Sequence, residues 1–505
     1  MTVMLRLRLL GLTNLRLDLV LTAMLLLVLL ASRFAALPAT IWDQDEAYMA
    51  AAVVAFDPTA LHPHPPWFPL WLVLGKAVHT LGAEPDRALQ LVSLAFSWWI
   101  VFPLTALWSH LVPRRQAVLA TLLFLALPGP WLFAGRAFTG TAATALLASA
   151  LALWIRRSPS RLALAAGSFA AGCALLIRPQ FAVALAITLP LMWRRTAVER
   201  LRWLLLPLGA MLIAGGVGLV ATSGGAAELL ESLVTHAGYH LGGLSGADRS
   251  LAASGLARAL GHPVAAVGWV FLSVLGTVVL LRQSSSRSAS TVLLAALLPL
   301  AASIWFLADP GHARYAVPLL ALSSGLVIAA LAWVSRHSPH LAVTAAVLAS
   351  VLSIFPELPG YRSEAAPTLE ALNTGATIAD REGGAVCVDH RLVAFVDLET
   401  ATQRLASPVL FDHVVALNGA VALPDACAAA VLAAGHPALG ILEGPRRSFS
   451  CTGSWMRRLT RSDFCTVTVI ARSQRLDAGG PAEEAEIVSE SDPVDVAIIK
   501  DVRLR

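Results

Sequence analysis

Long apolar segments, separated by short polar connections, fill the first 355 residues of the chain. A helix that crosses the hydrocarbon core of a bilayer needs about 20 mostly apolar residues. That length predicts one membrane domain over residues 1–355, with about eleven transmembrane helices. We expect them near 17–37, 88–108, 116–134, 138–155, 162–177, 180–193, 203–222, 263–281, 290–307, 315–335 and 341–355. The first segment is too long for a cleavable signal peptide, and no small-residue cleavage site stands before the charged stretch that follows it.

The composition agrees with a polytopic α-helical membrane protein. Of the 505 residues, 57% are hydrophobic and 14% are charged, whereas soluble proteins average about 25% charged residues. These values argue against an ordinary soluble protein and against a disordered one, which would have low hydrophobicity. The net charge is +5, but the arginines lie in short loops between apolar segments rather than on one soluble face. We therefore expect no nucleic-acid partner.

The arginine positions predict how the chain is oriented in the membrane. Alternate connections are rich in arginine, and they contain Arg114, Arg156, Arg194, Arg282 and Arg336. The positive-inside rule assigns these connections to the cytoplasm. The N-terminus is then inside, while the segments 38–87 and 223–262 and everything after residue 355 are outside. These assignments predict a multi-pass protein of a bacterial inner membrane whose active site and C-terminus are extracytoplasmic.

The chain changes character after residue 355. Short β-like runs, among them Ala385–Val388, 392–396 and 465–471, alternate with Ala-rich stretches. This alternation predicts a small extracytoplasmic α/β domain over residues 356–480. Residues 481–505 are acidic, and we expect them to form a poorly ordered tail.

Four of the five cysteines lie in the predicted C-terminal domain. An even number of cysteines in an exported domain is compatible with two disulfides. Proximity in the sequence favours the pair Cys451–Cys465, and Cys387–Cys427 would then follow. Four reduced and buried thiols are the alternative.

Three carboxylates follow the first apolar segment, at the start of the predicted outer loop 38–87. Asp43, Asp45 and Glu46 lie within four residues of one another, and Tyr48 follows them. Acidic side chains gathered at a membrane surface are candidates for acid–base chemistry. The plainer alternative is a solvated loop, or a helix N-terminus at which acids favour the helix dipole.

A proline-rich segment follows, with His62-Pro63-His64-Pro65-Pro66 at its centre. Its prolines exclude a regular helix. The apolar run 67–81 beyond it carries Lys76 and is short for a span, so we predict an interfacial helix on the outer leaflet. His62 and His64 could join the nearby acids as metal ligands, but no third histidine or cysteine stands at ligand spacing.

These motifs, taken in order, resemble the GT-C superfamily of glycosyltransferases. The matching segments are Asp45-Glu46-Ala47-Tyr48, His64-Pro65-Pro66, Asp86-Arg87-Ala88-Leu89, Gly135-Arg136-Ala137-Phe138-Thr139, Ile177-Arg178-Pro179-Gln180 and His312-Ala313-Arg314-Tyr315. The resemblance covers residues 1–355. It is nearest to the branch of protein-mannosyltransferases and aminoarabinose transferases, which take sugars from polyprenyl phosphates. The region after residue 355 carries no motif of the family, although an exported C-terminal domain is common in it.

The resemblance implies a glycosyltransferase that inverts the anomeric carbon. A monosaccharide would move from an outer-leaflet polyprenyl-phosphate donor to a hydroxyl of a cell-envelope glycan, lipid or protein. Such a transfer needs one general base and no enzyme nucleophile. By motif match the base is Asp45, with Glu46 adjacent to it and Asp43 as the fallback. The residues implied for the substrate pocket are Tyr48, His64 and Tyr315.

Arg136, Arg314 and Arg178 are the predicted ligands of the donor phosphate, and Lys76 is a weaker candidate. The three arginines stand at outer ends of apolar segments, where a charge is costly and often functional. A guanidinium also fits a phosphate with two parallel hydrogen bonds. Arg178 stands at the turn between two apolar runs, each too short to cross the membrane by itself. A turn at membrane depth is tolerated where it is buried in protein or lines a cavity, so this position favours a pocket. The alternative for all four is a side chain that snorkels to the membrane interface.

The sequence departs from the family after Gly135-Arg136. Many relatives carry an acidic residue a few positions on, whereas Gly140 and Thr141 stand there in this chain. A second acidic contact to the acceptor is therefore in doubt. Because His-Pro-Pro is typical of the metal-independent branch, we expect no metal and no other cofactor.

Two other classes of function stay open. A transporter or flippase of lipid-linked sugars would also be polytopic, but transporters often show internal repeats, and none is seen here. A non-catalytic membrane scaffold that presents the C-terminal domain would leave the acidic cluster 43–46 unexplained. Substitution of Asp45 distinguishes these classes, since a scaffold would tolerate it.

Overall fold

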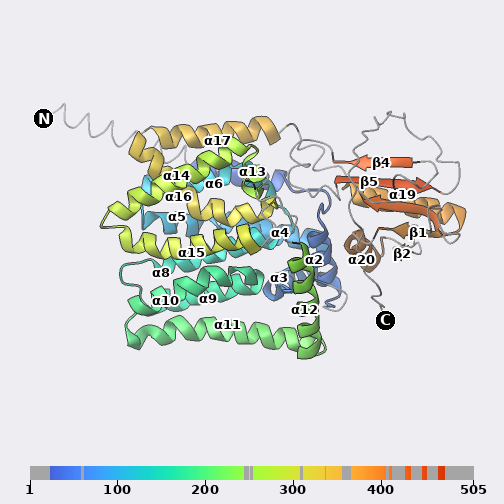
Figure 1. The fold of residues 1–505 in the computed structure, drawn as a ribbon, viewed down its shortest axis with the longest axis horizontal. Helices are drawn as coiled ribbons and strands as arrows, with labels where there is room; N and C mark the ends of the chain where they lie inside the picture. The colour runs from blue at the N-terminus through green and yellow to red at the C-terminus, as the bar shows by residue number, and fades with distance from the viewer. Residues whose placement is uncertain are drawn as a thin grey trace.

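A computed structural model of the chain describes residues 23–57, 62–243, 250, 254–307, 311–335, 337–354, 356, 366–389, 392–404, 409–411, 427–433, 439, 446–451 and 465–471. Over these residues, long helices form a bundle and a small sheet with two helices lies beyond one end of it (Figure 1). The acidic segment 481–505 lies outside the described residues.

Each apolar segment of the sequence coincides with a helix or with two consecutive helices. In chain order these are Ala23–Ala35, α4 (Pro85–Trp99) with α5 (Val101–Ser109), α6 (Arg114–Ala126) with α7 (Pro128–Phe133), α8 (Thr139–Trp154), α9 (Arg161–Ile177), α10 (Ala182–Arg195), α11 (Leu201–Thr222), α14 (Pro263–Arg282), α15 (Arg287–Leu307), α16 (Ala316–Val334) and α17 (Ser338–Ile354). Proline at the first turn starts α4, α7 and α14, where its missing N–H costs no hydrogen bond.

Five described segments are long and apolar enough to cross a membrane: Pro85–Ser109, Val198–Thr222, Pro263–Arg282, Arg287–Phe306 and Ala313–Val334. Large apolar side chains on α11 and α14, such as Ile213 and Phe271, point outward and are exposed. Helices that are apolar on their outer as well as their inner faces are typical of membrane spans. The chain is a multi-pass membrane protein, and the number of eleven spans stays a prediction.

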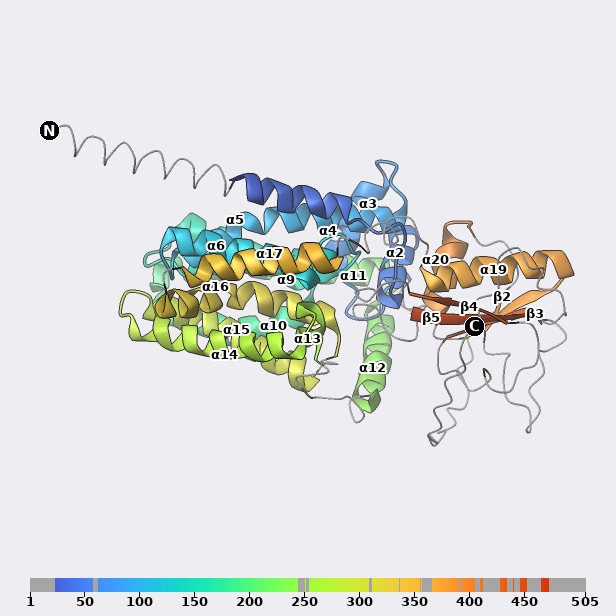
Figure 2. The same cartoon turned by 90° about the horizontal axis from the view of Figure 1, so that it is seen from above.

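Shorter elements complete the bundle. They are α2 (Gln44–Val54), α3 (Pro69–His79), α12 (Ala226–Gly243), α13 (Gly255–Leu260) and the 3-10 turns η1 (Pro179–Phe181), η2 (Val198–Arg200) and η4 (Ala313–Tyr315). The segment predicted as an interfacial helix forms α3, which packs against α2 and α4. Figures 1 and 2 both show α2, α3 and α12 at the end of the bundle nearest the sheet.

The C-terminal region forms the predicted α/β arrangement, with a five-stranded sheet in the order β2-β1-β3-β5-β4. Its elements are α19 (Pro367–Glu382), β1 (Ala385–Val388), α20 (Val393–Ala401), β2 (Val409–Phe411), β3 (Cys427–Ala433), β4 (Arg446–Ser450) and β5 (Thr466–Ala471). Strand β1 pairs parallel with β2 and β3, whereas β5 pairs antiparallel with β3 and β4. Helix α19 covers the sheet, and Gly375 lets it approach Val431 and Val386 closely.

The β-like run 392–396 is not a strand. It forms the start of α20, which packs against α2 of the membrane domain. Five of the nine residues of α20 are buried: Ala394, Phe395, Val396, Leu398 and Glu399. A short apolar run is ambiguous between helix and strand, and here tertiary packing decides.

Two disulfides join the strands of the C-terminal domain. Cys387 of β1 is bonded to Cys427 of β3, and Cys451, after β4, is bonded to Cys465, before β5. The fifth cysteine, Cys173, is free and buried in α9. The disulfides therefore link neighbouring strands rather than joining the domain to the bundle.

Candidate active site

The acidic cluster lies at the start of α2, and Asp43 is the reason that the helix begins there. Asp43 is the N-cap residue, and its Oδ1 accepts a hydrogen bond from the backbone N–H of Asp45 at 3.0 Å. Asp45 and Glu46 occupy the first turn, where negative charge favours the helix dipole. Asp43 is therefore the helix-capping acid that the sequence offers as an alternative to acid–base chemistry. The carboxylates of Asp45 and Glu46 form ion pairs with two different arginines.

Glu46 is fully buried and forms an ion pair with Arg136, which is also fully buried. Its Oε2 accepts hydrogen bonds from the Nε of Arg136 and from the backbone N–H of Trp42, both at 3.1 Å. Its Oε1 accepts from the backbone N–H of Ala137 at 2.8 Å. Glu46 therefore ties the start of α2 to the segment that leads into α8.

The sequence predicts that Arg136 binds the donor phosphate. In the structure, Arg136 is instead fully buried and paired with Glu46. Its guanidinium faces Glu46 and is flanked by the rings of Phe133 and Phe138, with centroids at 5.7 and 5.0 Å. An isolated buried charge is costly, so this arginine needs its carboxylate partner. The motif around Arg136 indicates a charged residue, but it does not indicate the partner of that charge, because Glu46 lies 90 residues earlier in the chain.

Asp45 lies in a cluster of its own, with Arg314 and His64. Arg314 forms an ion pair with Asp45 and also reaches Asp43, whose Oδ1 lies 3.5 Å from Nη1. The Nε2 of His64 lies 3.3 Å from the other Asp45 oxygen. The Asp45 side chain is 19% exposed, in contrast to the fully buried Glu46. Of the two neighbouring acids, Asp45 is the one that a substrate can reach.

Arg178 lies beside this cluster and is 6% exposed. Within the described part of the chain it forms no ion pair with a carboxylate. Its guanidinium carbon lies 5.1 Å from the ring centroid of Tyr315, and that of Arg314 lies 5.2 Å from the same ring. One tyrosine therefore brings together two arginines from different elements, the end of α9 and the turn η4.

The first turn of α8 lies next to the guanidinium of Arg178. Gly140, which has no side chain, allows this close approach. A Cβ atom at Gly140 would lie 3.2 Å from the Nη1 of Arg178. Helix α8 has no side-chain cap at Phe138, so its first backbone N–H groups are not occupied by the N-cap side chain. Such N–H groups and an adjacent guanidinium together favour an anion.

The proline-rich segment also contacts the site, through His64. The ring of Tyr48 lies near the rings of both His62 and His64, with centroid distances of 6.2 and 6.1 Å. The Nε2 of Gln44 donates a hydrogen bond to the hydroxyl of Tyr48 at 3.2 Å. The side chain of His62 also contacts Asp397 of α20, with 2.9 Å between Nε2 and Oδ2. Sequence reasoning does not find Asp397, because it lies 335 residues from His62 and in no motif.

Two other predicted features can be located. Lys76 is half-buried on α3. Across the described part of the chain, no group of three or more His, Cys, Asp and Glu residues could hold a metal ion. The position between Asp43 and Asp45, where an Asp-x-Asp pair could hold a cation, is occupied by the guanidinium of Arg314.

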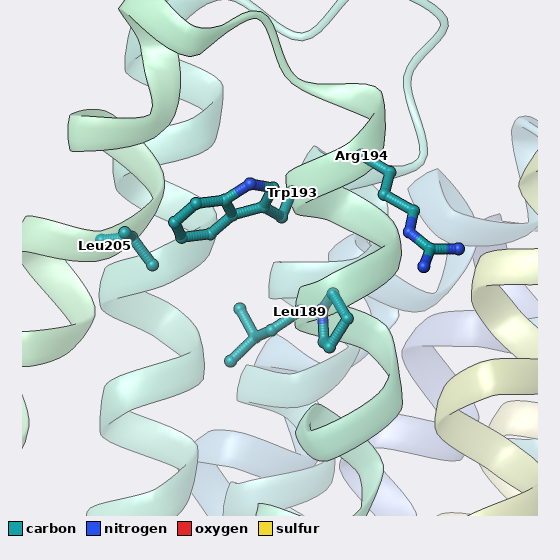
Figure 3. A pocket seen from close by; sticks show the side chains of 5 residues that line it. Leu189, Trp193, Arg194 and Leu205 are labelled. Atoms are coloured by element: carbon teal, nitrogen blue, oxygen red, sulfur yellow. The ribbon is translucent and has the colours of Figure 1, made fainter.

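A cavity of about 350 Å³ lies between α10 and α11, away from these residues. It is lined by Leu189, Pro190, Trp193, Arg194 and Leu205 (Figure 3). Its lining is almost wholly apolar and contains none of the predicted site residues.

The fold is similar to that of ArnT from Cupriavidus metallidurans. The structure of ArnT bound to undecaprenyl phosphate has a TM-score of 0.52 and 13% sequence identity, over 92% of this chain and 99% of that one. Its apo structure has a TM-score of 0.50 and 13% identity, over 93% and 100% of the two chains. The likeness extends over most of both chains, and it shows that this chain shares the membrane fold of ArnT.

A weaker likeness is to the oligosaccharyltransferase of Archaeoglobus fulgidus, in its complex with Zn and sulfate. The TM-score is 0.42 and the identity 14%, over 76% of this chain. This chain spans only 62% of the length of that protein. No protein-family model and no curated protein sequence matches the chain.

Proposed function

We propose that the chain is an inverting GT-C glycosyltransferase that moves a monosaccharide from a polyprenyl-phosphate donor to an acceptor hydroxyl. The observation that carries this proposal is Arg178, a nearly buried guanidinium without an ion-pair partner among the described residues. Arg178 and Arg314 both lie close to the ring of Tyr315, and Arg314 is paired with Asp45. A site with an available cation next to a reachable carboxylate suits the transfer of a sugar from a phosphate leaving group.

Asp45 is the general base in this proposal. The acceptor oxygen attacks the anomeric carbon while its proton passes to the Asp45 carboxylate. The bond between the anomeric carbon and the phosphate oxygen breaks, and polyprenyl phosphate leaves with the electron pair. A single displacement of this kind inverts the anomeric carbon. Asp45 forms an ion pair with Arg314, and its carboxylate is the form that accepts a proton.

The donor phosphate is bound by Arg178, with Arg314 as its neighbour. Two guanidiniums close to the Tyr315 ring offer planar pairs of donors, and the start of α8 adds backbone N–H groups. Arg136 is not part of this phosphate site, because Glu46 already neutralises it. Tyr48 and His64 lie next to Asp45, and the acceptor would approach Asp45 beside them.

The proposed setting is a bacterial inner membrane, with the site on its extracytoplasmic side. The site lies at the end of the bundle nearest the C-terminal sheet. The connections between α5 and α6, between α10 and α11, and between α14 and α15 lie at the opposite end (Figure 1). These connections are the arginine-rich ones, which supports a cytoplasmic location for them. The acceptor is then a glycan, lipid or protein of the cell envelope.

The test is a transfer assay with the full chain in nanodiscs, using polyprenyl-phosphate sugars and extracts of cell-envelope acceptors. We expect release of polyprenyl phosphate coupled to appearance of a glycosylated product. Arg178→Lys should raise the donor KM, because an ammonium cannot form the two-pronged contact. The matched control is Arg202→Lys, since Arg202 also stacks on a ring, that of Trp203, but lies outside the site.

Movement of the intact donor across the bilayer without release of polyprenyl phosphate would identify a flippase instead. An unchanged donor KM in Arg178→Lys would remove the proposed phosphate site. Full activity in Asp45→Asn would exclude the general base that the mechanism requires.

A further inference from the structure

The proline-rich segment that carries His64 has few ways to hold itself in place. Pro63, Pro65 and Pro66 have no backbone N–H to donate. Of the remaining N–H groups, that of Trp67 bonds to the His64 carbonyl at 3.1 Å, and that of Phe68 bonds to the Pro66 carbonyl at 2.9 Å. Both bonds are internal to the segment. Its position against α2 therefore depends on its other contacts.

His62 supplies such contacts on both its backbone and its side chain. Its backbone exchanges two hydrogen bonds with Asp57, of 2.7 and 2.9 Å, just after α2 ends. Its Nε2–H donates to Oδ2 of Asp397 at 2.9 Å. Most of the His62 side chain is buried and that of Asp397 is 27% exposed, so the bond is partly shielded from water.

Asp397 belongs to the C-terminal domain, and its helix is docked on the membrane domain. Helix α20 packs against α2, the helix that carries Asp45. Beyond α20, Arg404 reaches Oδ1 of Asp86 at 3.4 Å, at the start of α4. The backbone N–H of Ala366, just before α19, donates to the hydroxyl of Thr40 at 2.9 Å. Among the described residues, polar contacts thus attach the domain through Asp397, Arg404 and Ala366, and Asp397 bonds to the segment that carries His64.

His62 and His64 stand on either side of Pro63, and both contact Tyr48. A shift of His62 therefore moves His64, whose Nε2 lies 3.3 Å from the Asp45 carboxylate. We propose that the C-terminal domain completes the active site, with Asp397 as a positioning residue that holds His62 and thereby sets His64 against Asp45. This inference rests on the proposed function, in which Asp45 is the base.

The first test is a double-mutant cycle in the full chain, measured as donor-dependent transfer. We expect Asp397→Ala and His62→Ala each to lower kcat by up to about 100-fold, since small misplacements at a reacting centre are that costly. The donor KM should change little, because the arginines that bind phosphate are untouched. The double variant should be no worse than either single one. The matched control is Glu370→Gln, an exposed acid of α19 in the same domain.

Rescue separates positioning from a general loss of fold. Asp397→Asn keeps a carbonyl oxygen that can accept from the His62 Nε2–H, so it should retain most of the kcat that Asp397→Ala loses. Wild-type kcat in Asp397→Ala, or additive losses in the double variant, would overturn the proposal. Equal losses in the Asn and Ala variants would do the same.

Hydrogen exchange tests the same contact without catalysis. In the full chain in nanodiscs, Asp397→Ala should speed exchange of the His62, Trp67 and Phe68 amides relative to wild type and to Glu370→Gln. Unchanged exchange would overturn the inference. If the wild-type protein shows no transfer from any donor, the proposed function fails, whereas this measurement still decides whether Asp397 holds the segment.

Discussion

Glu46 and Arg136 form a fully buried ion pair that joins the start of α2 to the segment before α8. Asp45, the adjacent residue, turns to the partly exposed side and contacts Arg314 and His64. Consecutive residues of a helix point about 100° apart. Glu46 can therefore form an ion pair in the core while Asp45 contacts the residues of the site. The Asp-Glu pair therefore combines a structural residue with a candidate base.

Removing the charge of Glu46 should destabilise the protein strongly. Glu46→Gln keeps the size of the side chain but leaves Arg136 buried without a counter-charge, which typically costs about 3–5 kcal/mol. The measurement is the Tm of the purified protein in detergent, with the exposed Glu370→Gln as the control. Adding Arg136→Gln to Glu46→Gln should cost less than the sum of the two single changes. A Tm equal to wild type in Glu46→Gln would contradict this role.

Asp45→Asn should abolish transfer while leaving the Tm unchanged. The amide cannot take the acceptor proton, and general bases contribute about 10²- to 10⁴-fold. Asp43→Asn is the informative comparison, because asparagine is also a good N-cap and should preserve the start of α2. We expect it to lose much less activity in the same assay. The reverse order would move the base to Asp43.

Gly140→Ala should weaken donor binding specifically. The new Cβ would stand 3.2 Å from Nη1 of Arg178 and 3.6 Å from the Arg314 carbonyl oxygen, so the Arg178 guanidinium must shift. We expect the donor KM to rise about tenfold, equivalent to roughly 1.4 kcal/mol. Gly209→Ala is the matched control, since a Cβ there meets nothing within 4 Å. Equal KM values in the two variants would show that Arg178 does not bind the donor.

The interface between the domains should depend on pH through Glu399. Burial raises the pKa of Glu399; Arg404 lowers it in part, and Asp86 raises it further. A raised pKa means that the folded protein favours the neutral acid, so the contribution of Glu399 to stability falls as pH rises above its unfolded pKa of about 4.3. Glu399→Gln should therefore gain in Tm relative to wild type as pH rises from 4 to 7. A constant Tm difference over that range would contradict the raised pKa.

The disulfides predict a simple labelling pattern. A thiol reagent applied to the denatured, non-reduced protein should modify only Cys173, and after reduction it should modify all five cysteines. Intact mass spectrometry counts the modified sites. Five modified cysteines without reduction would correspond to four reduced thiols in the C-terminal domain. That result would also argue against an extracytoplasmic location.

Several features follow from the sequence alone, because they depend on neighbouring residues. Hydrophobic length places the helices of the bundle, and proline starts α4, α7 and α14 at the positions that local sterics favour. The motifs Asp45-Glu46 and His312-Ala313-Arg314-Tyr315 indicate the charged residues that meet at one end of the bundle. The switch in pattern after residue 355 predicts a separate α/β domain.

Only the tertiary structure decides which charge meets which. Arg136 and Arg178 look alike in the sequence, as arginines at the ends of apolar segments. The fold pairs Arg136 with Glu46 inside the core and leaves Arg178 beside Tyr315. The run 392–396 becomes helical because α20 packs on α2, and that contact also brings Asp397 to His62. Burial and ion pairing depend on distance in space, which a pattern of neighbouring residues does not contain.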